Sequence, residues 1–128
     1  MPRRSVPPLA EDGLPARESG EWTKEKLYYI EHYAKAFMTA MAAKRGSAKW
    51  SELVYLDLLC GPGRCVIRGT GEVVDGSPLR ALKTRPGFDR LFFADASQVN
   101  IDVLSKRIPA GEAHRVQLQV GDCNVSVR

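Results

Sequence analysis

An aspartate followed by a Gly-x-Gly turn is the feature of this sequence with the clearest chemical use. Residues 55–63 run Tyr-Leu-Asp-Leu-Leu-Cys-Gly-Pro-Gly, an apolar stretch typical of a buried strand that ends beside an acid. Glycine lacks a Cβ and lets a ligand approach the backbone closely. In open α/β sheets, ligands bind at the carboxyl ends of the strands. We therefore predict a site for a nucleoside-containing cofactor at Asp57, Cys60, Gly61, Pro62 and Gly63.

The glycine pair fits more than one kind of structure. A dinucleotide site needs a third glycine three residues later and a helix directly after the glycines. Val66 occupies that third position, and the run Arg-Gly-Thr-Gly at 68–71 is not typical of a helix. The spacing Asp-x-x-x-Gly-x-Gly instead resembles the first motif of class I S-adenosylmethionine-dependent methyltransferases. An ordinary turn between a strand and a loop is the simplest alternative.

Two later strands are also predicted to end in an acid. Residues 90–95 are largely apolar and end at Asp95, and residues 115–122 alternate apolar and polar side chains and end at Asp122. A carboxylate at Asp95, next to Ala96, has lone pairs for both hydroxyls of a ribose. The resemblance implies that Asp122, next to Cys123, meets the adenine amino group. Each acid taken singly also fits a turn residue or helix cap.

Composition is that of a single domain. The chain has 128 residues, of which 44% are hydrophobic and 27% charged. It holds no apolar run near the roughly 20 residues needed to span a bilayer, and Met1–Pro8 lacks the apolar core of a secretory signal. We therefore expect a cytoplasmic protein without membrane contact. The three cysteines form no Cys-x-x-Cys pair and have no ligand spacing to a histidine, which disfavours a disulfide framework or a metal site.

Charge leaves nucleic acid open as a partner. A formal net charge of +4 permits contact with nucleic acid but does not require it. The basic residues are scattered along the chain, which favours a solvated surface over a nucleic-acid patch.

The pattern along the chain predicts an α/β fold with a leading helix. Residues 1–20 lack periodicity and are expected to be a flexible arm, with the domain at 21–128. Residues 64–75 are predicted to form a hairpin or flap around Gly-Thr-Gly. The leading helix is expected from a Thr23 cap to Gly46, with an apolar face of Leu27, Ile30, Ala34, Phe37 and Met41. The other expected elements are a strand over 50–59, a helix over 77–84 capped by Ser77, a strand over 90–95, a helix over 98–107 capped by Ser97 with Val99, Val103, Leu104 and Ile108 apolar, and a strand over 115–121 after a loop that holds His114.

The chain resembles the three-Cys-motif partner family, a bacterial group with a Rossmann-like, class I methyltransferase-like core. The likeness rests on several segments: Trp22, Lys26-Leu27, Tyr33, Asp57–Gly63, Gly76–Leu79 and the strand that ends at Asp95. It implies S-adenosylmethionine as cofactor and a three-Cys-motif protein as partner, and it identifies neither the methyl acceptor nor catalytic residues. A class I methyltransferase sheet has about seven strands, so the resemblance implies an N-terminal half whose C-terminal part is missing and which is inactive alone.

A non-enzymatic function is the main alternative. A degenerate Rossmann-like fold with an unpaired strand edge would act mainly by binding a partner protein, because unpaired edges invite association. A nicotinamide oxidoreductase is a third hypothesis, disfavoured by Val66.

Overall fold

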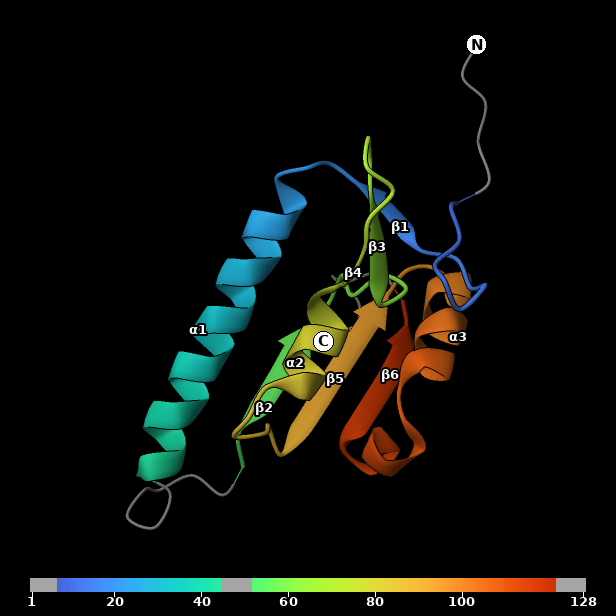
Figure 1. Ribbon diagram of the computed structural model, residues 1–128. Coiled ribbons are helices and arrows are strands. Elements are labelled where there is room, and N and C mark those ends of the chain that lie inside the picture. The colour runs from blue at the N-terminus through green and yellow to red at the C-terminus, as the bar shows by residue number, and fades with distance from the viewer. Residues whose placement is uncertain (1–6, 45–51, 122–128) are drawn as a thin grey trace.

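The computed structural model describes residues 7–44 and 52–121. It is a mixed α/β fold in which two small sheets lie beside a long helix (Figure 1). In chain order the elements are β1 (Arg17–Ser19), α1 (Thr23–Ala43), β2 (Val54–Asp57), β3 (Arg64–Ile67), β4 (Val73–Asp75), α2 (Ser77–Lys83), β5 (Arg90–Asp95), α3 (Gln98–Arg107), the 3₁₀ helix η1 (Ala110–Arg115) and β6 (Val116–Val120).

The central sheet is fully parallel and is built from the three strands expected near 50–59, 90–95 and 115–121. Its strand order is β2-β5-β6, and both pairs are parallel, with Tyr55 opposite Leu91 and Phe93 opposite Leu118. β5 has the bounds predicted from sequence, and β2 and β6 are shorter than predicted. Because all three strands run the same way, their carboxyl ends meet at one edge of the sheet, which is where a cofactor site was predicted.

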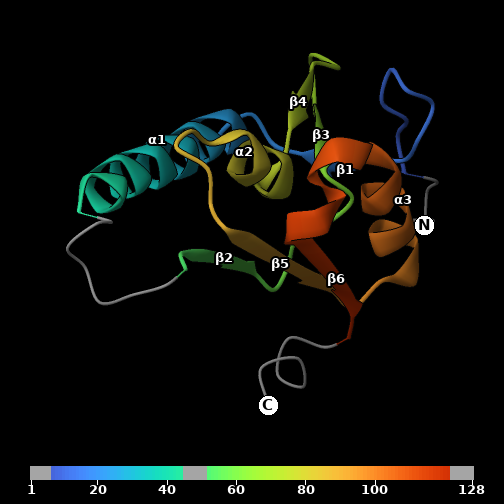
Figure 2. The ribbon, with the colours of Figure 1, turned by 90° about the horizontal axis from the view of Figure 1, so that it is seen from below.

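The helices cover one face of this sheet (Figure 2). α2 packs against β2 and β5, while α3 packs against β5 and β6. The core between these layers includes Leu91, Phe93 and Leu104, none more than 1% exposed. On β2 the alternate side chains Val54 and Leu56 are exposed. The central sheet therefore has one packed face and one accessible apolar strand, within the part of the chain that the structure describes.

The second sheet corrects the predicted arm and confirms the predicted hairpin. β3 and β4 pair antiparallel, with Cys65 opposite Val74, which is the hairpin expected over 64–75. β1 pairs parallel with β3, and Ala16 is 1% exposed just before it. The expectation of a flexible arm is therefore wrong for residues 7–20, because strand pairing to β3 and burial of small side chains hold this short segment.

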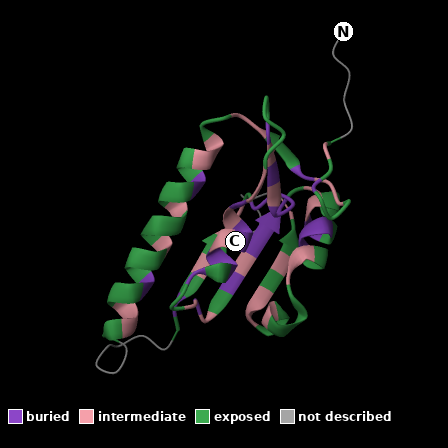
Figure 3. Cartoon of the chain, in the orientation of Figure 1, coloured by how far each residue is buried: buried purple, intermediate pink, exposed green. Residues whose placement is uncertain are grey.

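Helix α1 is much more exposed than its pattern predicted (Figure 3). Leu27 and Met38 are the buried residues of α1, whereas Phe37, predicted to face the core, is 47% exposed. Thr23 is the first helical residue rather than the cap, and Gly46 lies outside the described residues. Phe37 is exposed because α1 packs along α2 through a narrow stripe, which leaves the outer part of its apolar face accessible.

The start of α3 and the segment that holds His114 bear on further expectations from the sequence. The amide of Asn100 donates to the Ser97 hydroxyl at 3.2 Å, which confirms Ser97 as the cap of α3. Val99 in the first turn of α3 is exposed, contrary to the expected pattern, and His114 lies in η1 rather than in a loop. Across the described residues, none of the helices combines the length and apolar character needed to cross a membrane.

Candidate functional site

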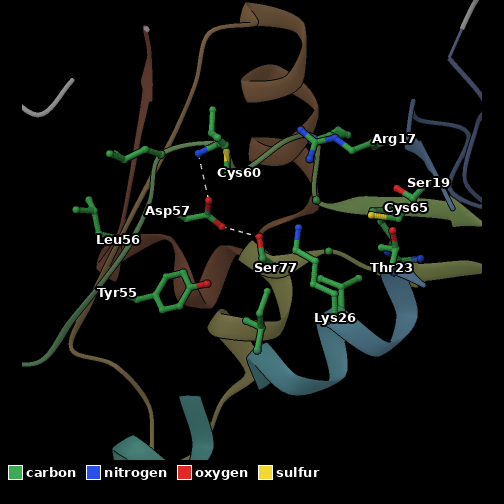
Figure 4. A pocket seen from close by; sticks show the side chains of 18 residues that line it. Arg17, Ser19, Thr23, Lys26, Tyr55, Leu56, Asp57, Cys60, Cys65 and Ser77 are labelled. Carbon is green, nitrogen blue, oxygen red and sulfur yellow. Dashed lines mark hydrogen bonds between the residues drawn. The ribbon is translucent and has the colours of Figure 1, made fainter. Parts of the chain in front are cut away.

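A cavity of about 500 Å³ opens at the carboxyl end of β2 (Figure 4). Its walls come from β1, the first turns of α1, the end of β2, the glycine loop after it and the start of α2. This volume lies within the roughly 300–1,000 Å³ of typical small-molecule sites. The predicted residues Asp57, Cys60, Pro62 and Gly63 line it, so the structure brings most of the first motif to one opening.

The glycine loop has a backbone shape that other residues adopt with strain. Gly61 has a φ of +70° and Gly63 a φ of +99°, both in the left-handed region. A Cβ on Gly63 would approach a methyl carbon of Leu104 to 2.9 Å, which ties the loop closely to α3. A Cβ on Gly61 would approach the guanidinium of Arg17 to 2.7 Å. Both glycines are therefore required by backbone shape and by close neighbours.

Asp57 is held in a fixed orientation at the cavity wall. The Ser77 hydroxyl donates to its Oδ2 at 2.6 Å, and the Leu59 amide donates to its Oδ1 at 3.2 Å. Ser77 was predicted to cap α2, but Gly76 occupies the cap position and the hydroxyl turns to the carboxylate. A hydrogen bond to an ionised acceptor is stronger than one to a neutral group, which explains why the Ser77 hydroxyl donates to Asp57 rather than capping α2. Asp57 thus presents a negative charge with defined geometry.

Asp95 is buried and engaged in internal hydrogen bonds. The amides of Gly61 and Ser97 donate to its two oxygens, each at 2.9 Å, and the Asn100 side chain donates at 3.3 Å. Its residue is 7% exposed, and it does not line the cavity beside Asp57. The carboxylate therefore fixes the glycine loop to the start of α3, and the contact with a ribose stays a prediction.

Arg107 fixes the same loop from α3. Its side chain is 3% exposed and donates to the carbonyls of Pro62 and Leu14, at 2.9 Å each. It also makes two hydrogen bonds to Asp12, both at 2.9 Å. These bonds hold the pKa of Asp12 well below its usual range. One buried cation thereby joins the N-terminal segment, the glycine loop and α3.

The ionisable groups at the floor of the cavity favour binding over covalent chemistry. Burial, followed by the nearby carboxylates of Asp57 and Asp95, raises the pKa of the Cys60 thiol to about 12. Burial and Asp57 likewise raise the pKa of Tyr55 to about 12. Both groups are therefore protonated at neutral pH, and a thiol nucleophile requires the thiolate form. The Cys60 thiol is therefore not an activated nucleophile.

Several functional residues were missed from sequence, and others cannot be placed. The cavity also contains Arg17 from β1, which lies in no recognised motif, and Lys26 from α1, which belongs to the family resemblance but was not predicted to lie in the site. Ala96 is exposed just beyond Asp95. Asp122 and Cys123, predicted to lie near the adenine, are outside the described residues.

Comparisons with protein families, curated proteins and solved structures find no match to this chain. Within residues 7–44 and 52–121, no cluster of His, Cys, Asp and Glu side chains has the arrangement of a metal site. The chemical character of the cavity is therefore the basis for a functional proposal.

Proposed function

We propose that this chain binds S-adenosylmethionine in the cavity at the end of β2, as a class I methyltransferase-like protein whose methyl acceptor is not specified by the site. The observation that supports this most directly is the combination of an oriented carboxylate, Asp57, with two left-handed glycines at the carboxyl end of a parallel strand. That combination offers an ammonium partner and a close backbone approach in one opening of suitable volume.

The residues present fit such a cofactor. A Cβ at Gly61 would collide with the Arg17 guanidinium and a Cβ at Gly63 with Leu104, so glycine is needed for the loop to keep this shape beside the cavity. The Gly61 amide is also held by Asp95. Asp57 would hold the cofactor's ammonium, and its hydrogen bonds to Ser77 and Leu59 set the direction of the carboxylate. These contacts would orient the bound molecule.

The protein's part in such a reaction is alignment. S-adenosylmethionine supplies an electrophilic methyl group bound to a positively charged sulfur. Transfer of that group requires little covalent chemistry from the protein, whose contribution is to hold the reacting groups in line. The protonated state of Cys60 and Tyr55 is consistent with this role, since neither offers a base at neutral pH.

Calorimetric titration of the purified chain tests the proposal. S-adenosylmethionine and its demethylated product, S-adenosylhomocysteine, should both bind, and NAD should bind much more weakly. Asp57→Asn removes the charge while keeping the shape, and we expect about a tenfold loss of affinity, the effect of one charge-assisted hydrogen bond. Asp102→Asn, at an exposed position of α3, is the matched control and should leave affinity unchanged. Equal or tighter binding of NAD would reject the cofactor assignment.

A second candidate function is binding of a partner protein through α1. Trp22, Tyr29, Tyr33 and Phe37 are each at least 47% exposed, and their spacing places them on one side of this helix. Exposed aromatic side chains that gather on one surface mark interaction sites. The resemblance names a three-Cys-motif protein as the partner to test.

Co-purification of the two proteins distinguishes the two functions. A stable complex that forms equally with and without S-adenosylmethionine, and that is lost in Tyr33→Ser but not in the neighbouring Lys35→Ser, would favour partner binding as the main role. Absence of a complex would leave cofactor binding as the better-supported function.

A further inference from the structure

Arg17 enters the cavity from a strand that fixes its position. β1 pairs in parallel with β3, and Arg17 lies opposite Cys65 in that register. Side chains alternate along a strand, so Arg17 and Ser19 face the cavity together while Glu18 does not line it. The preceding residue, Ala16, is buried and donates its amide to the Pro8 carbonyl at 2.8 Å. The guanidinium is therefore presented by an anchored backbone.

Among the cations of the cavity, Arg17 makes one long ion pair and keeps hydrogen-bond donors that a ligand could use. Arg64 is paired with Glu11 and Asp75. Lys26 lies over the Trp22 ring, 5.7 Å from its centre. The Arg17 guanidinium is 3.8 Å from Asp95, beyond hydrogen-bond distance, and its side chain is 48% exposed.

The guanidinium and the carboxylate of Asp57 face one opening from different sides. In Figure 4, Arg17 points into the cavity over the loop at Cys60, and Asp57 points into it from the end of β2. The guanidinium lies directly against Gly61, where a Cβ would meet it. A cation on an anchored strand and an oriented anion that line one opening match a ligand that has an anion and a cation at one end.

We propose that Arg17 binds the carboxylate of an α-amino-acid group on the ligand, while Asp57 binds the ammonium of the same group. This inference deepens the cofactor assignment and rests on it. The planar fork of an arginine suits a carboxylate because two N–H groups can donate in parallel. Arg17 is thereby a specificity residue: it favours ligands with an intact amino-acid end over those that lack the carboxylate.

Matched ligands test this directly by titration calorimetry. S-adenosylmethionine and decarboxylated S-adenosylmethionine differ at the carboxylate and share the sulfonium, ribose and adenine. The unmodified chain should prefer the first. Arg17→Gln should lower affinity for S-adenosylmethionine by about tenfold to a hundredfold and leave affinity for the decarboxylated ligand nearly unchanged. Arg17→Lys should restore part of the preference, because it keeps the charge but not the fork.

Controls separate this inference from the assignment beneath it. Arg90→Gln removes the same charge at the opposite end of β5 and should preserve the ligand preference. Thermal melting of each variant checks that it is folded, and Arg17→Lys provides the test if Arg17→Gln does not fold. If Arg17→Gln loses affinity equally for both ligands, or for neither, the role of Arg17 is overturned while the cofactor assignment stands. A gain for both would show instead that the guanidinium blocks the loop at Gly61. Failure of the unmodified chain to bind either ligand would overturn the cofactor assignment itself.

Discussion

Replacement of Asp95 by alanine should destabilise the fold substantially. The substitution leaves the buried amide of Gly61 and the partly buried amide of Ser97 without their acceptor, and each of those bonds is 2.9 Å long. A hydrogen bond to a charged group contributes about 1.5–3 kcal/mol, and neighbouring bonds are not additive. We therefore expect the free energy of unfolding to fall by about 3 kcal/mol, equivalent to about 10 °C in Tm for a domain of this size.

Urea unfolding followed by circular dichroism measures this change. Asp102→Asn removes a carboxylate from the same region whose partner, Gln98, is exposed, and it should change the free energy of unfolding by less than about 0.5 kcal/mol. Asp95→Asn should lose less stability than Asp95→Ala, because its amide oxygen can still accept from one backbone N–H while its nitrogen cannot accept from the other. An unfolding free energy unchanged by Asp95→Ala, together with lost affinity for S-adenosylmethionine, would refute the reasoning and assign the carboxylate to the ribose.

Three further outcomes are expected. Arg107→Met should lower the free energy of unfolding by about 2–3 kcal/mol, because the side chain is buried and bridges three segments. Arg107→Met should also weaken the dependence of the free energy of unfolding on pH under acid conditions. The pKa of Asp12 is lowered in the folded chain, so the stabilisation that Asp12 contributes is complete above its ordinary pKa near 3.8 and disappears as the pH falls below that value. Urea midpoints with the same pH dependence in the unmodified chain and in Arg107→Met would contradict this. Ser77→Ala should cost about 1 kcal/mol and several-fold in S-adenosylmethionine affinity by releasing Asp57, whereas an unchanged affinity would show that the orientation is set elsewhere. In a variant whose other cysteines are serine, Cys60 should react slowly with maleimide at pH 8, and labelling as fast as in urea would contradict the raised pKa. The free energy of unfolding should also fall as the pH rises from about 9 towards 12, because the unfolded chain loses the thiol proton first.

Strong local patterns made much of the central sheet predictable. The run that ends at Asp95 is apolar and compact, and Ser97 follows it as a good cap, so β5 and α3 were placed correctly. The two short β-like runs around Gly-Thr-Gly similarly predicted the hairpin of β3 and β4. In each case the residues that decide the structure are neighbours in sequence.

Features that depend on distant residues were not predictable. β1 has three residues without a repeating pattern, and its pairing with β3 fixes it, so Arg17 gave no sign of lying in the site. Asp95 ends a strand in the sequence, but whether its oxygens face a ligand or an amide depends on where the glycine loop folds back. Ser77 before a proline looks like a helix cap, and only the fold brings Asp57 close enough to attract its hydroxyl. The partners of these side chains are therefore set by tertiary contacts, which neighbouring residues in the sequence do not reveal.

The bond between Arg107 and Asp12 has a consequence for how the chain is made. These residues are 95 positions apart, and Arg107 also holds the carbonyl of Pro62. Closing so long a loop is entropically costly, and contacts of this range form late in folding. A ribosome adding about 5–20 residues per second delivers the glycine loop some seconds before α3. The pocket should therefore acquire its final shape only after α3 has been synthesised, and a ligand present in the cell should stabilise the chain from that point rather than its earlier intermediates.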